Sequence, residues 1–154
     1  MTALNYSTIT EAVRSQIELY AKTYADDYPN LGSLKVVAER EFEFTEGWVG
    51  IYLIRRTAPD ERQSLSAGLK TRFNLEFEIK VWHYAAETSL AVEIRNEVLG
   101  MMETAIMSDR TFAGNVNACW ITGGEFESGR DPSNNGKFWA GASVNLTCDC
   151  TSSI

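Results

Sequence analysis

The sequence has little of several residues and patterns that would narrow its function. Among 154 residues it has one histidine and three cysteines, and it has no long apolar run. Without such a run we expect no membrane-spanning helix. Three cysteines, an odd number, do not make a disulfide framework in a domain of this size. No HxxxH, HExxH or Cys/His spacing surrounds the histidine, so we expect neither a metal nor another cofactor.

Basic residues are also few. The chain has 14 Lys and Arg against 21 Asp and Glu, for a net charge of −7. A protein that grips the phosphate backbone tightly needs a clustered basic face, so this balance argues against a dedicated nucleic-acid binder. The N-terminus lacks a basic region followed by an apolar core, so we expect no secretory signal and synthesis in the cytoplasm. The length favours a single domain over residues 1–154.

The clearest pattern lies in residues 72–107. Its first half alternates strictly, with Phe73, Leu75, Phe77, Ile79 and Val81 on one parity and polar residues on the other. Alternation with period two predicts a strand with one buried and one solvated face, over residues 71–84. The second half changes to helical spacing and predicts an amphipathic helix over residues 87–107. Its apolar stripe is Leu90, Ile94, Val98, Met101, Met102, Ala105 and Ile106.

The flanking segments supply the rest of a core. Residues 7–27 predict a helix, with Thr8 and Glu11 as a capping box. Residues 34–56 predict a β-hairpin that turns at Thr45-Glu46-Gly47. Residues 57–70 predict a long loop or arm, and residues 115–150 a second hairpin with its tip at 127–137.

These elements together predict an α+β fold. We expect an antiparallel sheet with the helices packed on one face and with extended hairpin loops.

Two groups of side chains are candidates for chemistry. Acidic rows are predicted on the polar parity of two strands, where solvated and partly paired carboxylates are a better interpretation than an acid–base pair. A third interpretation is an acidic surface that lines an opening. The row members are Glu39, Glu41, Glu43, Glu76 and Glu78. His83 shares the apolar parity, and a contact with nearby backbone at the end of its strand is favoured over a catalytic or ligand role.

The thiols of Cys119, Cys148 and Cys150 are expected to act as small apolar groups, since no fourth ligand completes a zinc site. A less favoured interpretation places Cys148 and Cys150 near a subunit boundary, where they form intermolecular disulfides in an oxidising medium.

The order of elements resembles a known family. The helix, the hairpin, the strand FNLEFEIKVWHYA, the helix SLAVEIRNEVLGMMETAI and a closing strand KFWAGASVNLTCDC are similar to the tail terminator proteins of long-tailed bacteriophages, which include the minor tail protein U type. The resemblance covers roughly residues 7–150 and is one of architecture and pattern. It carries over no catalytic residue, so we expect a structural protein and no enzyme.

The resemblance implies a hexameric ring at the head-proximal end of the tail tube, within the virion. Such a ring ends tube polymerisation, docks the head–tail connector and, in contractile phages, holds the last sheath ring. DNA passes through its lumen without specific binding. Head-completion and stopper proteins have similar sizes, so another neck component is one alternative. A small ligand-binding or enzymatic α+β domain, with His83 and the carboxylates as its site, is the alternative from a different class.

Under this resemblance two sets of residues become candidates for assembly. The acidic rows named above are the candidate lumen surface, because like charge keeps passing DNA from sticking. Contacts with neighbouring subunits are expected from an exposed aromatic residue on the last strand, from the arm and from the tip loop. The candidates are Trp139, Arg62, Leu65, Arg130 and Lys137.

Overall fold

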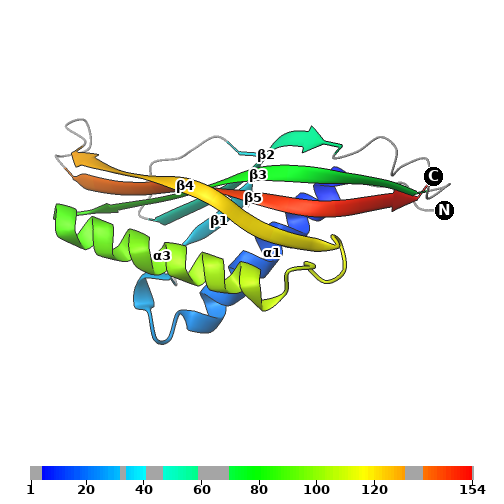
Figure 1. Ribbon diagram of the computed structural model, residues 1–154. Coiled ribbons are helices and arrows are strands. Elements are labelled where there is room, and N and C mark those ends of the chain that lie inside the picture. The colour runs from blue at the N-terminus through cyan, green and yellow to red at the C-terminus, as the bar shows by residue number, and fades with distance from the viewer. Residues whose placement is uncertain (1–4, 32–33, 41–46, 59–69, 131–136, 154) are drawn as a thin grey trace.

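Figure 1 shows the computed structural model, which describes residues 5–31, 34–40, 47–58, 70–130 and 137–153. In this part of the chain five strands form one sheet, and two α-helices and a short 3₁₀ helix accompany it. In chain order these are α1 (Tyr6–Tyr24), η1 (Pro29–Leu31), β1 (Lys35–Ala38), β2 (Gly47–Thr57), β3 (Lys70–Ala85), α3 (Thr88–Ser108), β4 (Ala118–Arg130) and β5 (Phe138–Ser153). The prediction of an α+β fold is confirmed.

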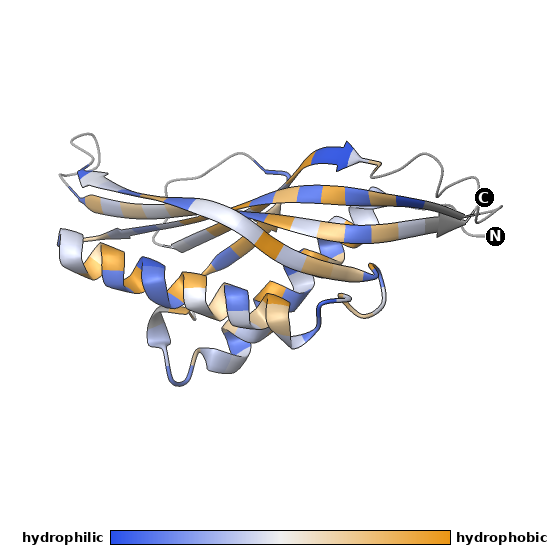
Figure 2. Cartoon of the chain, viewed as in Figure 1, coloured by the Kyte–Doolittle hydropathy of each residue, from blue (hydrophilic) through white to orange (hydrophobic). Residues whose placement is uncertain are grey.

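The sheet has the strand order β1-β2-β3-β5-β4, and β3 lies at its centre. β3 pairs antiparallel with β5 along all of its length, from Lys70 opposite Ser153 to Ala85 opposite Phe138. Figure 2 shows the alternation of apolar and polar residues along these central strands. The five apolar side chains of β3 predicted to be buried are each at most 1% exposed. The alternation therefore identified the core strand and its buried face correctly.

Both α-helices pack on the same face of the sheet (Figure 1). Six of the seven predicted stripe residues of α3 are buried, but Leu90 is 42% exposed. Ala91 takes its place in the core and is fully buried. Successive residues of an α-helix are rotated by about 100° around its axis. At this end of α3 that rotation directs Ala91 toward the sheet and leaves Leu90 at the solvent side. We call the surface covered by the helices the helix face and the opposite surface the open face.

The predicted hairpin over 34–56 is wrong. β1 and β2 run parallel, with Lys35 opposite Trp48 and Ala38 opposite Ile51, so the sheet is mixed. The chain leaves the sheet at Glu39, whose φ is 54°, a left-handed value that is uncommon outside glycine. The Glu39 carboxylate accepts a hydrogen bond from the backbone N–H of Leu53 at 2.7 Å, which holds this turn in place. Residues 41–46, which include most of the predicted turn, lie outside the described residues.

The start of α1 also differs from the prediction. The N-cap is Asn5, whose side-chain oxygen accepts a hydrogen bond from the Ser7 N–H at 2.9 Å. Thr8 lies inside the helix, and Glu11 forms an ion pair with Arg14 at 2.6 Å instead of closing a capping box. Asn5, three residues before Thr8, is also a residue type that caps helices, and the structure uses it instead of the predicted Thr8.

The connection from α3 to β4 is a left-handed turn stabilised by Asp109. Phe112, Ala113 and Gly114 have φ values of 47°, 58° and 82°. The Asp109 carboxylate accepts hydrogen bonds from the hydroxyl and N–H of Thr111 and from the N–H of Ala113, at 2.6, 3.0 and 2.8 Å. From α1, the Gln16 amide donates to two carbonyls at the end of α3, which ties the two helices together. The backbone strain of this turn is therefore offset by local and tertiary hydrogen bonds.

We predict that Asp109→Asn makes stability less dependent on pH in the acid range. The hydrogen bonds from the Thr111 hydroxyl and from the Ala113 and Thr111 N–H groups lower the pKa of Asp109. A lowered folded-state pKa means that the carboxylate contributes stability above its unfolded pKa and loses it as the pH falls through the folded value. Thermal unfolding from pH 7 to pH 2 should show the variant less stable at pH 7, with the difference shrinking in the most acidic buffers. A difference that stays constant with pH would contradict this assignment.

Candidate functional site

The open face is the broad surface that neither α-helix covers. Its aromatic part is built around Trp82 of β3 and Trp139 of β5. The two indoles stack with centroids 4.4 Å apart and planes at 11°. Trp82 lies opposite Gly141, and Trp139 lies opposite Gly129. A Cβ at Gly141 would come within 2.8 Å of the Trp82 ring, and one at Gly129 within 3.0 Å of the Trp139 ring. The glycines thus make room for the stacked indoles, and Trp139 is half-buried in this stack.

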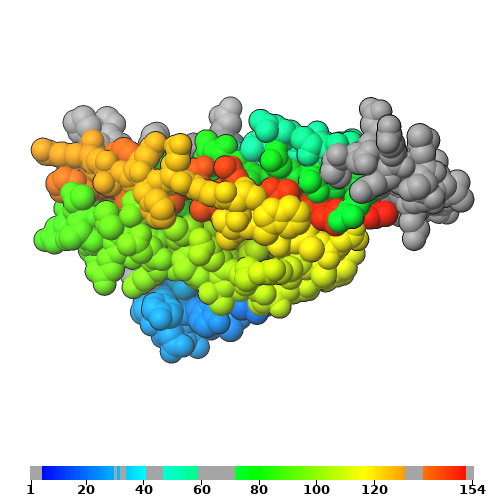
Figure 3. Space-filling view, in the orientation of Figure 1, coloured from blue at the N-terminus to red at the C-terminus, as the bar shows by residue number. Residues whose placement is uncertain are grey.

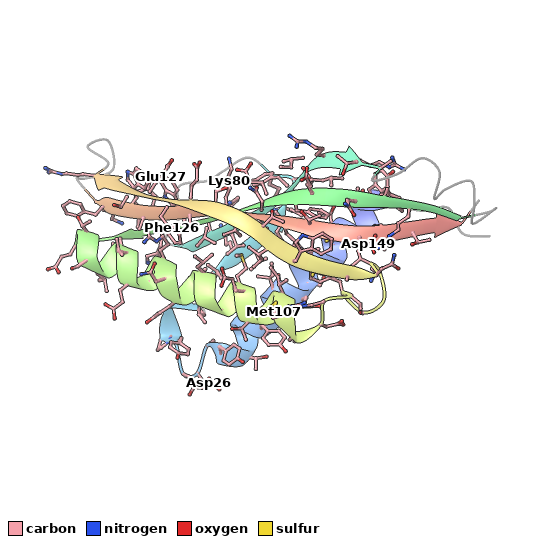
Figure 4. All side chains as sticks on the ribbon, in the orientation of Figure 1. Asp26, Lys80, Met107, Phe126, Glu127 and Asp149 are labelled. Atoms are coloured by element: carbon pink, nitrogen blue, oxygen red, sulfur yellow. The ribbon has the colours of Figure 1, made fainter. Side chains whose placement is uncertain are left out.

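A groove of about 480 Å³ lies beside this stack on the open face. Its wall on β4 carries Glu125 and Glu127, and its wall on β3 carries Lys80. Figure 4 shows Lys80 and Glu127 on the same side of the sheet. Glu78 accepts a hydrogen bond from the Ser143 hydroxyl at 3.2 Å and lies 3.5 Å from the Lys80 ammonium. The groove therefore has mixed charge, with its unneutralised carboxylates concentrated on β4.

The predicted acidic rows are only partly acidic in the structure. Glu76 lies 3.4 Å from the guanidinium of Arg55, and Glu78 is neutralised as described above. Glu39 caps the backbone of β2, and Glu41 and Glu43 lie outside the described residues. Arg55 comes from the neighbouring strand β2, which alternation within β3 does not reveal, whereas Lys80 is two residues from Glu78 on β3 itself. The placement of these carboxylates around a lumen stays a prediction.

The predicted interface residues that the structure describes lie at one end of the β4–β5 hairpin. Arg130 is the last residue of β4 and is exposed, and Lys137 directly precedes β5 and is half-buried. Both belong to the far end of the β4–β5 hairpin, where Arg130 is opposite Phe138. Arg62 and Leu65 lie outside the described residues. Trp139 lies at the same end, two residues after Lys137 and opposite Gly129, the neighbour of Arg130. A contact of this end with a neighbouring subunit stays a prediction.

The intermolecular disulfides proposed for Cys148 and Cys150 are contradicted by the structure. Their side chains point to the helix face with Cys119, and all three are at most 1% exposed. All three thiols are free. Burial is the main cause that raises the pKa of the Cys150 thiol, to about 11. The parity that placed the two residues on one face was right, but that face is the core, so the interpretation as small apolar groups is confirmed.

We therefore predict that iodoacetamide modifies none of the three cysteines while the protein is folded. All three side chains are at most 1% exposed, so the reagent cannot reach them. Cys150, with a pKa of about 11, also has roughly a hundredfold less thiolate at pH 8 than an ordinary cysteine. Mass spectrometry after treatment with and without denaturant should show full modification only in the unfolded chain. Rapid labelling of native Cys148 or Cys150, or a disulfide-linked dimer on a non-reducing gel, would contradict the burial.

His83 does not meet the carboxylates in a catalytic arrangement. It is 7% exposed and lies on the helix face, whereas Glu76 and Glu78 lie on the open face of the same strand. Side chains on opposite faces of a strand cannot share one reacting atom. In the described part of the chain, no three His, Cys, Asp or Glu side chains are grouped to hold a metal ion.

The outer edge of β4 is a feature that the sequence analysis missed. β4 pairs with β5 on one side, and on its other side no strand pairs with it among the described residues. Trp120 is 41% exposed and Phe126 is 59% exposed along this edge. The alternation Glu125-Phe126-Glu127 is typical of a strand, but the prediction placed the start of the tip loop at residue 127 and so ended the strand too early. Arg130, not Phe126, is where the strand ends.

Arg95 of α3 holds this edge strand against the helix. The Arg95 side chain is buried, and its guanidinium donates hydrogen bonds to the carbonyls of Glu127 and Gly141 at 3.1 and 3.4 Å. The same group lies 5.0 Å from the ring centroid of Phe126. Burial lowers the pKa of Arg95. The edge is thus a firmly supported surface, even though its outer side is exposed.

The sequence matches no protein-family model, and no curated protein is similar to it. Over the described ranges, no helix has both the length and the apolar character needed to cross a bilayer. Among the described surfaces, the outer edge of β4 is the one whose exposed backbone and aromatic side chains are suited to binding a partner.

Proposed function

We propose that this protein is a structural subunit of a bacteriophage virion, a tail terminator that forms a hexameric ring on the tail tube. The observation that supports the proposal is the outer edge of β4. It is 13 residues long and exposes two large aromatic side chains. Exposed strand edges of this length are normally shortened, covered or paired, because their free N–H and C=O groups recruit other strands. A strand from a partner would pair with the free N–H and C=O groups of the β4 edge.

The two margins of the sheet support a ring over a twofold dimer. One margin is β4, and the other is made by the four-residue β1 and by the part of β2 that β1 does not reach. A contact between unlike margins is heterologous, and heterologous contacts close into rings when the rotation allows. The β4 edge can therefore recruit the opposite margin of the next subunit.

The charge distribution is compatible with passage of DNA. The net charge is −7, and three cations of the open face are paired with carboxylates: Arg55 with Glu76, Lys80 with Glu78, and Arg72 with Asp149. Arg40 also lines the groove on this face. Over the described part of this face, a phosphate backbone would meet no run of unpaired cations. A channel lined in this way would let DNA slide without specific binding.

The test is the effect of the purified protein on polymerisation of a tail tube protein from the same phage. A terminator should bind the growing end and shorten the tubes seen by electron microscopy. Trp120→Lys, which puts a charge on the β4 edge, should abolish the effect. Leu19→Lys is the matched control, since Leu19 is 62% exposed on α1 and far from β4 in sequence. Tubes of unchanged length with the unmodified protein would contradict the proposal.

A further inference from the structure

The two margins of the sheet carry opposite charge. β1 pairs with β2 only from Trp48 to Ile51, so residues 54–57 form the margin beyond it and are all exposed. This segment reads Ile-Arg-Arg-Thr, and Ile54 is 49% exposed. On β4, residues 125–127 read Glu-Phe-Glu and are also exposed. Each margin thus presents an apolar side chain flanked by charges, basic on β2 and acidic on β4.

The register places these charges on matching faces. Arg55 is opposite Glu76, Glu125 is opposite Ser143 and Glu127 is opposite Gly141, so all three point to the open face. Arg56 is opposite Leu75 and Phe126 is opposite Ala142, so both point to the helix face. In a sheet that continues from one subunit to the next with its faces preserved, Arg55 would meet the two carboxylates and Arg56 the phenyl ring.

We propose that β4 of one subunit pairs with residues 54–57 of β2 in a second copy of this chain, joining the two sheets edge to edge. β2 and β4 run in opposite directions within one subunit. In a head-to-tail contact the strands of the second subunit keep the directions that they have in the first, so the new pair of β4 with β2 is antiparallel. Arg55 lies beside Glu125 and Glu127, and Ile54 is buried against Phe126. The inference rests on the proposed ring and names the contact that builds it.

The geometry of closed sheets agrees with this contact. Arg55 is directly opposite Glu76 of β3. Glu125 is opposite Ser143 of β5, which is opposite Lys80 of β3, so Glu125 lies at the height of Lys80 along the sheet. The contact therefore requires a stagger of four residues along the strands, or about 13 Å, across four strands spanning about 19 Å. That ratio corresponds to a strand tilt of about 35°, within the range that closed sheets adopt. A stagger of this size is what a ring of joined sheets needs.

The charged groups are free to make the new contact. Arg55 has only a long ion pair with Glu76, at 3.4 Å, and its side chain remains 65% exposed. In the described part of the chain neither Glu125 nor Glu127 has an ion pair. Like charges along each margin would repel a copy that docked β4 to β4, so the charges favour the head-to-tail arrangement.

Charge reversal tests the contact. Glu125→Lys/Glu127→Lys and Arg55→Glu should each lower the fraction of subunits in rings by about tenfold, measured by light scattering after size exclusion. Arg56 is left unchanged because its guanidinium donates a hydrogen bond to the Tyr6 hydroxyl at 2.9 Å. An equimolar mixture of the two variants should restore rings, because each subunit then meets a complementary margin on both sides. Rescue also shows that both variants are folded.

The control is Glu93→Lys/Glu103→Lys, the same charge change on exposed positions of α3. It should leave ring formation unchanged. If the unmodified protein forms rings and the β4 and β2 reversals do not weaken them, or if mixing does not rescue them, the proposed contact is wrong and the ring stands. If the unmodified protein forms no ring even with tube protein present, the proposed function fails together with the contact.

Discussion

Replacing Gly141 by alanine is expected to lower the free energy of unfolding by about 1–3 kcal/mol, the usual cost of overpacking. The added Cβ would lie 2.8 and 3.1 Å from two carbon atoms of the Trp82 ring. The ring cannot turn aside easily, because it is stacked on Trp139 at 4.4 Å. Urea unfolding followed by tryptophan fluorescence measures both the stability and the indole environment.

Gly100→Ala is the matched control for this prediction. A Cβ at Gly100 would meet no atom within 4 Å, and the residue lies inside α3. Alanine is favoured over glycine in a helix interior by about 0.5–1 kcal/mol, so this variant should be more stable than the unmodified protein. The same chemical change is thus expected to have opposite signs at the two positions. Equal effects would mean that the indole stack does not constrain Gly141.

Arg95→Ala is the second change with a large expected effect, about 2–3 kcal/mol of destabilisation. It removes the donors to the carbonyls of Glu127 and Gly141 and the contact with the Phe126 ring. The loss should concentrate in the far half of the β4–β5 hairpin, since that is where the guanidinium contacts the two strands.

Hydrogen exchange locates this effect. Amides in residues 124–130 and 138–143 should exchange faster in Arg95→Ala, while those in the centre of β3 should change only with global stability. Arg110→Ala is the control, because Arg110 is exposed and its one side-chain hydrogen bond is to the sulfur of Met107. Uniform loss of protection over the whole sheet would show that Arg95 supports the core in general and not the edge strand.

The sequence was informative where one periodicity dominated. The alternation in β3 and the stripe of α3 are driven by burial on one face, so they predict structure locally. The β1–β2 pairing was not predictable in this way. Two adjacent alternating segments with a Gly-containing turn are typical of a hairpin, but the two strands pair in parallel. The hydrogen bond from the Leu53 N–H to the Glu39 carboxylate beside them is a contact that no pattern within either segment indicates.

The candidate site was harder to predict because it depends on neighbours across the sheet. The ion pair of Arg55 with Glu76 joins residues from different strands, and no pattern within either strand indicates it. The exposed edge at Phe126 depends on the position of β4 in the strand order, which is a property of the whole sheet. Chain periodicity shows which residues face the core, and topology decides which polar or aromatic residues are left at a margin.

The most direct test of the account is hydrogen exchange of β4 in the free and the assembled protein. Antiparallel pairing with β5 alone leaves alternate N–H groups of β4 facing outward, so about half of its amides should exchange quickly in the free subunit. On ring formation, with or without tube protein, the part of β4 around residues 124–128 should gain protection, together with residues 54–57 of β2. Assembly that leaves the exchange of β4 unchanged, or a protein that stays monomeric with tube protein present, would contradict the account.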